Sequence, residues 1–217
     1  MVENQEIYYE ELKPEDEFSF QCKNCGECCR KVKNGVMLES LDLFRIAQHL
    51  EQDIGTVINK YTEMQLLVWG YPVFLLKTTD PSDTCIFLKN NKCSIHFSKP
   101  KTCRIYPLGV GPDAKTKDNF LYYMVSKEEK HLQGKKQSVK SWFDQYLTKE
   151  DRDLLNLDYR AAQEIGKILR QISDDKLKDV VKLVLLFKYF NFDIDQDFKM
   201  QFLKNMAQLK ILLQDLI

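Results

Sequence analysis

The sequence predicts an α+β fold, with a small antiparallel sheet in the first part of the chain and helices around and after it. Short runs of β-branched, aromatic and aliphatic residues, bounded by turn-forming residues, occur within residues 66–126. From about Lys149 onwards, apolar residues recur three or four positions apart, which is the helical period. All seven cysteines lie in the first half of the chain. We therefore expect a cysteine-rich domain over residues 18–147 and a helical extension packed on it over residues 148–217.

Two helices are predicted after the first cysteines. Ser40 is a suitable N-cap for a helix that runs to about residue 51. Asp53 is a suitable N-cap for a second helix, from Ile54 to about Met64. The apolar side chains that share one face of the first helix, and that we expect in the core, are Leu41, Phe44, Ala47 and Leu50.

The middle of the chain predicts short strands. "LLVWGYPVFLLK" favours one or two of them, and "NFLYYMVS" (119–126) favours another. "CIFLKNNKCSI" has two apolar runs around Asn90-Asn91, which is typical of a β-hairpin. Ser138 is a suitable cap for a helix that includes Trp142. These strands supply the β part of the predicted fold.

The C-terminal region predicts three helices with apolar faces. We expect these faces either to form a core within the chain or to form a contact between two copies of it. The protein would then be a monomer or a homodimer through its C-terminal helices. The alternative is that the apolar faces bind a separate protein partner. The apolar stripe of the last helix comprises Phe198, Phe202, Met206, Leu209, Leu213 and Leu216.

Charge and hydropathy argue against three features: a nucleic-acid partner, a secretory signal and a membrane-spanning segment. Lys plus Arg (32) equals Asp plus Glu (32), which argues against nucleic acid as the main partner. The N-terminus is acidic and does not resemble a secretory signal. The most apolar stretch, residues 180–190, is too short to span a membrane and contains two lysines. We expect a cytoplasmic protein without a membrane segment, in which thiols stay reduced.

The opening cluster "CKNCGECC" places four cysteines in eight positions. The two-residue gaps let a loop turn its sulfurs toward one ion, and Gly26 permits a tight turn with positive φ. Clustered thiols in a polar sequence favour metal binding over buried, inert cysteines. Cys28 and Cys29 are adjacent and cannot bind one ion with the same geometry. Because Cys28 is in phase with the CxxCxxC spacing, our hypothesis is that Cys28 is a ligand and Cys29 is less essential.

A second group of candidates lies downstream. The predicted hairpin brings Cys85 close to Cys93, and His96 stands three residues further on. Soft sulfur ligands select zinc, copper(I) or iron–sulfur clusters. A CxxCxxC run with a remote cysteine is similar to ferredoxin-type loops and favours a 4Fe–4S cluster, and a zinc site fits the ligand count equally well. The predicted metal ligands are Cys22, Cys25, Cys28, Cys29, Cys85, Cys93, Cys103 and His96.

The cluster "CKNCGECC", followed by "CIFLKNNKCSIHFSKPKTCRIYP", resembles the YkgJ-type cysteine-cluster family, whose hallmark is CxxCxxCC and whose domain is described as zinc- or iron-chelating. The resemblance covers roughly residues 18 to 145. The chain has His96 where the family commonly has tyrosine, and Lys99 where arginine is common. Many members carry a further cysteine in a region that here contains only His131 as a substitute ligand.

Two functions follow. The residues favour a metal-binding protein with a redox or structural role. The family that the chain resembles includes flagellin lysine N-methylases. This resemblance implies an alternative function, that of an enzyme that transfers a methyl group from S-adenosylmethionine to a protein lysine. Calorimetry with that donor on the metal-loaded protein distinguishes the two. Arg104 and Tyr106 are the predicted cofactor-binding residues, because Arg104 would offset the negative charge of thiolates and Tyr106-Pro107 would fix the chain as it leaves the site.

Overall fold

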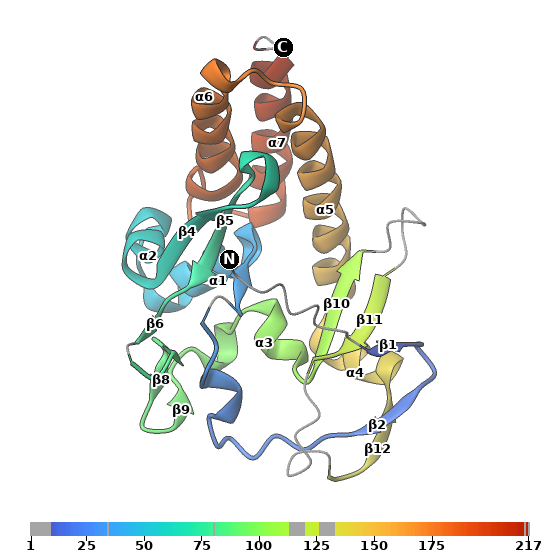
Figure 1. The fold of residues 1–217 in the computed structure, drawn as a ribbon. Helices are drawn as coiled ribbons and strands as arrows, with labels where there is room; N and C mark the ends of the chain where they lie inside the picture. Colours follow the sequence, from blue (N-terminus) through green and yellow to red (C-terminus); the bar gives the residue numbers. More distant parts are fainter. Residues whose placement is uncertain are drawn as a thin grey trace, which may run out of the picture.

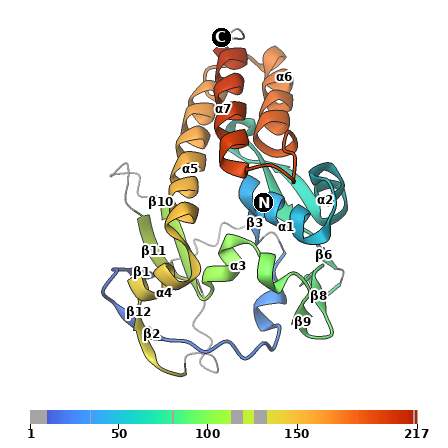
Figure 2. The ribbon, with the colours of Figure 1, turned by 180° about the vertical axis from the view of Figure 1, so that it is seen from behind.

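The computed structural model describes residues 10–33, 35–79, 81–112, 120–125, 133–214 and 216. Three long helices form one end of the molecule and the cysteine-bearing segments lie toward the other, with short sheets between and beside them (Figures 1 and 2). The predicted α+β fold is confirmed, and every paired strand among the described residues is antiparallel.

A three-stranded sheet and two helices adjoin the cysteine segments. The sheet has the order β3 (Met37–Leu38), β5 (Pro72–Leu76) and β4 (Thr62–Leu66). The central strand β5 is buried along its whole length, as its apolar sequence PVFLL requires. The helices are α1 (Ser40–Leu50) and α2 (Ile54–Tyr61).

Both predicted helices form, with small differences at their ends. Asp53 caps α2 as predicted, and its carboxylate accepts a hydrogen bond from the Thr56 N–H at 2.8 Å. The N-cap of α1 is Glu39 and not Ser40, because Glu39 and Asp42 form a capping box. The Ser40 hydroxyl instead donates to a buried backbone carbonyl. The second helix ends three residues earlier than predicted, where the chain enters β4 and pairs with β5.

The C-terminal region is helical, as predicted. It comprises α5 (Lys149–Leu169), α6 (Asp174–Leu185) with its π-helical continuation η4 (Leu186–Phe190), and α7 (Phe198–Gln214). None of the helices in the described residues has both the length and the apolar character needed to cross a bilayer. The predicted stripe faces inward: Phe198, Phe202, Leu209 and Leu213 of α7 are buried, Met206 is half-buried, and so is Leu216, which lies just beyond the helix.

A second sheet stands on the other side of the cysteine segments. It has the order β1 (Glu10–Leu12), β11 (Phe120–Met124) and β10 (Leu108–Pro112), and β11 confirms the strand predicted at residues 119–126. Next to it lie the pair β2 (Glu17–Ser19) and β12 (Lys136–Ser138) and the helix α4 (Val139–Tyr146), which Ser138 caps as predicted. The cluster that packs these elements together is Phe18, Ile105, Leu108, Val139, Trp142, Phe143 and Leu147.

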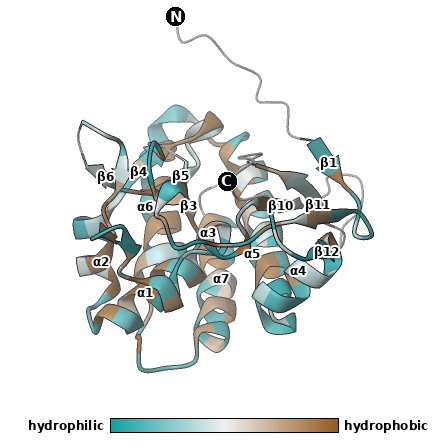
Figure 3. Cartoon of the chain, turned by 90° about the horizontal axis from the view of Figure 1, so that it is seen from below, coloured by the Kyte–Doolittle hydropathy of each residue, from teal (hydrophilic) through white to brown (hydrophobic). Residues whose placement is uncertain are grey.

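The largest hydrophobic cluster contains residues from both parts of the chain. Each helix carries both apolar and polar residues (Figure 3), and apolar residues three or four positions apart share a face that the helix can bury. Cys29, Cys93 and Cys103 pack against this cluster, which therefore forms the base beneath part of the cysteine region. Its members include Leu43, Ile46, Val57 and Phe74 from the first part, and Leu154, Tyr189, Phe198 and Phe202 from the second.

Candidate metal centre

Gly26 shapes the first cysteine segment. Its φ is +73°, and a Cβ at this position would lie 2.8 Å from Leu88 Cδ1 and 3.1 Å from the Asn91 carbonyl oxygen. Only glycine accommodates both the backbone conformation and the close approach. The turn leads into the 3₁₀ turn η1 (Glu27–Cys29), where the Cys29 N–H donates to the Gly26 carbonyl at 3.0 Å. The positive φ predicted for Gly26 is confirmed, and it lets the cysteine loop approach the downstream hairpin.

That hairpin forms where the sequence predicts it. Strands β8 (Leu88–Lys89) and β9 (Lys92–Cys93) pair across a two-residue turn. Asn90 and Asn91 have φ values of 49° and 60°, the left-handed conformation that such turns need and that asparagine tolerates. The preceding pair, β6 (Thr78–Thr79) and β7 (Thr84–Cys85), holds Cys85 beside the hairpin.

Arg30 joins the two cysteine segments. Its guanidinium donates to the Cys25 carbonyl at 3.1 Å and to the Asn91 side-chain oxygen at 2.6 Å. Because one side chain contacts both the loop and the hairpin turn, their separation is fixed by hydrogen bonds. The last cysteine, Cys103, lies on the short helix α3 (Lys101–Ile105), which follows the 3₁₀ turn η3 (His96–Ser98) and precedes the cis Tyr106–Pro107 bond.

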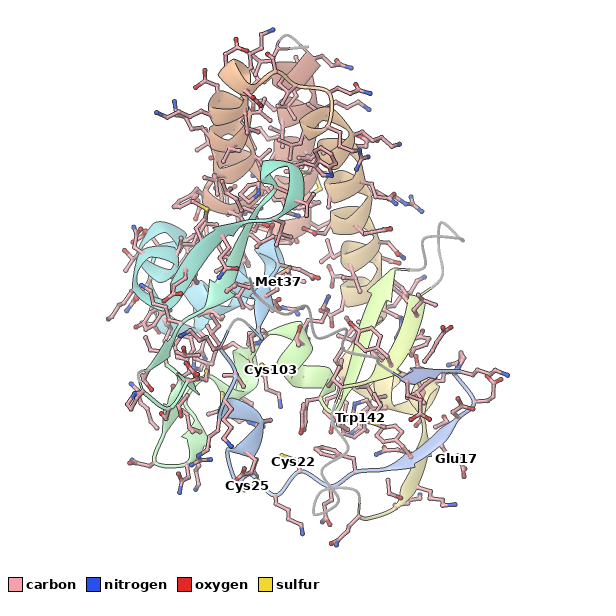
Figure 4. The ribbon with its side chains drawn as sticks, viewed as in Figure 1. Glu17, Cys22, Cys25, Met37, Cys103 and Trp142 are labelled. Atoms are coloured by element: carbon pink, nitrogen blue, oxygen red, sulfur yellow. The ribbon has the colours of Figure 1, made fainter. Side chains whose placement is uncertain are left out.

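The seven cysteines, all of them thiols, line a single cavity of about 360 Å³. Figure 4 shows Cys22 and Cys25 on the loop below Cys103, with Trp142 to the side of Cys22. The other predicted site residues, His96, Arg104 and Tyr106, line the same cavity. The structure thus brings together every candidate that the sequence identified among the described residues, whereas His131 lies outside them. That these residues bind a metal stays a prediction.

Five of the thiols influence one another, three through hydrogen bonds and two through charge alone. Cys29 hydrogen-bonds with both Cys28 and Cys85. The hydrogen bond with Cys29, together with burial, raises the pKa of Cys28. Burial raises the pKa of Cys103, and the neighbouring Cys29 and Cys28 add to this rise. Cys93 completes the group, and its pKa is also raised by burial. The hydrogen bond with Cys29 instead lowers the pKa of Cys85. Thiolates at the four positions with a raised pKa need a nearby positive charge, which a bound metal cation would provide.

The lining of the cavity is cationic. It includes Lys23, Lys92, Lys99 and Arg104, and no Asp or Glu is among its described residues. Two of these lysines, Lys23 and Lys92, were not identified from the sequence, where lysines near a cysteine motif give no distinct signal. Cationic side chains offset the excess negative charge of a thiolate-rich centre. The positive charge of the cavity lining thus suits a group of cysteine thiolates.

The thiols surround the cavity and do not meet at one point. Within the part of the chain that the structure describes, no group of three or more His, Cys, Asp or Glu side chains is arranged to hold a single ion. A structural zinc ion needs four ligands, with sulfurs about 2.3 Å from the metal.

Aromatic rings form another wall of the cavity. Phe20 lies edge-on to Tyr106 and to Trp142, with ring centroids 5.7 and 5.5 Å apart, and Trp142 contacts Tyr146 at 4.3 Å. All four line the cavity. Sequence reasoning placed only Tyr106 near the site, because these residues are far apart in the chain and only tertiary packing brings them together.

A family model described as "CxxCxxCC: Putative zinc- or iron-chelating domain" matches residues 21–137. The chain belongs to the CxxCxxCC family. Neither the curated proteins nor the solved structures contain a match to it. Membership of the CxxCxxCC family supports metal binding by the cysteine-rich part. The relation to flagellin lysine methylases is not confirmed, and methyl transfer stays a prediction from the sequence.

In this member of the CxxCxxCC family, buried charges anchor the helix that carries Cys103. The Lys101 N–H donates to the Asp42 carboxylate at 2.8 Å, and the Lys101 ammonium pairs with Glu39. Burial raises the pKa of Glu39 to about 7, although the nearby Lys101 lowers it. The start of α3 is thereby fixed to the start of α1.

The end of α3 is held by a second set of charges. Arg104 lies 3.4 Å from the Asp151 carboxylate, which is also 2.6 Å from the Arg45 guanidinium. Burial raises the pKa of Asp151, but Arg104, the Thr148 N–H and Arg45 outweigh burial and hold it below the usual range. Arg104 therefore links the cysteine cavity to the first turn of α5. A position of Arg104 near thiolates was predicted from the sequence, whereas nothing in the sequence indicates Asp151 as its partner.

Proposed function

We propose that this protein is a metal protein whose cysteine cavity holds an iron–sulfur cluster, with 4Fe–4S as the expected form. One observation carries the proposal: seven thiols from separate segments line one cavity of about 360 Å³, whose lining contains four cationic side chains and no described carboxylate. Iron–sulfur clusters are held by cysteine thiolates and carry negative charge. Family membership supports the coarser statement that this part of the chain chelates zinc or iron.

The ligands we propose are drawn from five thiols that line the cavity and influence one another electrostatically, namely Cys28, Cys29, Cys85, Cys93 and Cys103. Cys22 and Cys25 lie on a loop that lines the cavity and are the further candidates. When bound, an iron–sulfur cluster supplies reversible one-electron transfer. The role of the chain is to hold the thiolates together, to offset their charge through Lys99 and Arg104, and to limit water through its apolar and aromatic lining.

The deciding experiment is metal and acid-labile sulfide analysis, with a visible spectrum, on protein purified without oxygen. We expect iron and sulfide in similar amounts and a brown absorption that bleaches on reduction. Zinc without colour would overturn the iron–sulfur proposal and leave a thiolate zinc protein, which cannot transfer electrons. A folded protein with neither metal would overturn metal binding itself.

A pair of variants on one hairpin tests the ligands. Cys93→Ser is expected to lower the metal content, because a hydroxyl does not replace a thiolate toward soft metals. The control is Ser94→Ala, which removes only the hydrogen bond from the Ser94 hydroxyl to the Phe87 carbonyl. Equal metal content in both variants, measured on protein that remains folded, would exclude Cys93 as a ligand.

A further inference from the structure

Phe97 is the most exposed of the large hydrophobic side chains in the described residues, at 93%. It stands on η3 and lines the cysteine cavity, next to His96, whose ring meets it edge-on with centroids 5.8 Å apart. An apolar ring held in water at the mouth of a cavity is unfavourable for the isolated chain. Such a side chain is typical of a contact anchor, which becomes buried when a partner binds.

The surface around Phe97 is basic. From Thr84 to Pro112 the chain contains five Lys or Arg residues and no Asp or Glu, although the whole chain is neutral. Two of the five, Lys101 and Arg104, are paired with Glu39 and Asp151, which leaves Lys89, Lys92 and Lys99 for the surface. Lys92 and Lys99 line the cavity with Phe97, and no ion pair among the described residues engages either of them. Lys23 lines the same cavity from the cysteine loop. Unpaired cations beside an exposed ring attract an acidic surface.

We propose that an acidic protein docks on this basic rim, defined as Lys23, Lys92, His96, Phe97 and Lys99, and inserts an apolar contact around Phe97. A small anion would satisfy the lysines but would leave the ring uncovered. Nucleic acid is disfavoured by the zero net charge of the chain. The nearby guanidiniums are also engaged, that of Arg30 with Asn91 and that of Arg104 with Asp151.

Docking here would place the partner over the opening of the cysteine cavity. That the partner would face a metal centre rests on the proposed function, because it requires the cavity to hold a metal. The partner class follows from exposure and charge alone. A weak, charge-steered contact is typical of proteins that exchange electrons.

The test uses the full chain, purified with its metal, and a fluorescein-labelled random copolymer of glutamate and tyrosine as the probe. We expect the copolymer to bind more tightly than polyglutamate of the same length, with affinity that falls as salt rises. Phe97→Ser should weaken binding about tenfold or more, as removal of an aromatic anchor does. Lys92→Glu should weaken it several-fold and reduce the salt dependence.

Two exposed positions away from the rim give matched controls. Val68 is 74% exposed at the turn between β4 and β5, and Lys178 is exposed on α6. Val68→Ser and Lys178→Glu should leave copolymer binding unchanged. Failure of the wild-type chain to bind the copolymer, equal losses in the control and rim variants, or tighter binding of a labelled single-stranded RNA would each overturn the proposal. Metal content is measured in every preparation, so that loss of docking and loss of the metal centre are separated.

Discussion

Lys188 is almost completely buried, and its charge depends on one carboxylate. Its side chain is 2% exposed and its Nζ lies 2.6 Å from Asp158 Oδ1, while the Asp158 side chain is 18% exposed. Asp158→Asn keeps the shape of the side chain and removes the counter-charge. Removing one partner of a buried pair typically costs about 3–5 kcal/mol. With a urea slope of about 2 kcal/mol per M, the unfolding midpoint should fall by about 2 M.

The same variant predicts a change in pH dependence. Burial lowers the pKa of Lys188, but Asp158, Tyr71 and Tyr189 outweigh burial and hold it well above its usual value. The wild-type pair therefore stabilises the fold from neutral pH up to the unfolded lysine pKa of about 10.4, and on the alkaline side this contribution is lost only as pH rises through the higher folded pKa. Without Asp158, burial dominates and the folded pKa drops below the unfolded one. The destabilisation should then shrink between pH 7 and pH 10.

Urea unfolding followed by circular dichroism at pH 7 and pH 9.5 measures both effects. Lys188→Met is the control, because it removes the buried charge and leaves Asp158 near enough to the surface to be hydrated. We expect it to cost less than Asp158→Asn, and we expect the double variant to resemble Lys188→Met. The reasoning is refuted if Asp158→Asn costs under about 1 kcal/mol, or if its cost is the same at both pH values.

Three further predictions concern the site and its supports. Cys28→Ser should lower the metal content more than Cys29→Ser, and equal losses in metal analysis would contradict the assignment. Gly109→Ala should destabilise by about 1–3 kcal/mol, because its Cβ would lie 2.1 Å from a ring carbon of the facing strand, whereas Gly111→Ala, with its nearest contact at 3.8 Å, should cost much less in urea unfolding. Because the pKa of Asp151 is lowered in the folded state, Asp151 stabilises the fold above a pH of about 4, and this stabilisation is lost as pH falls through the folded pKa. The melting temperature of Asp151→Asn should therefore change less between pH 4 and pH 2 than that of the wild-type chain.

Local chemistry made the hairpin and the helix starts predictable. Asn90-Asn91 suits a two-residue turn, and Asp53 and Ser138 cap the helices expected of them. The N-cap of α1 was predicted one residue too late, because glutamate is not a usual N-cap and a distant contact occupies the Ser40 hydroxyl. The Ser40 hydroxyl is engaged by the carbonyl of Lys188, far along the chain.

The thiols of the site could be predicted from the sequence, whereas the charged residues that support it could not. Cysteine spacing identifies ligand candidates because the chemistry of metal binding restricts residue types. The charges that anchor α3 carry no such signal, since Asp42 and Asp151 both read as ordinary acidic residues in the first turn of a helix. Their burial, and their contacts with Lys101 and Arg104, result from tertiary packing.

Because the two parts of the chain share one core, a truncated chain must keep both parts to fold stably. A chain that ends at residue 147 would keep every cysteine but would lose Leu154, Tyr189 and Phe198 from the largest cluster. Phe44 and Phe74, which are 4% and 3% exposed, would then lose their ring contacts with Phe198 and Tyr189 and face water. Such a fragment would be prone to aggregation, and its failure to take up metal would say nothing about the cysteines. Metal loading is therefore best studied on chains that extend through α7.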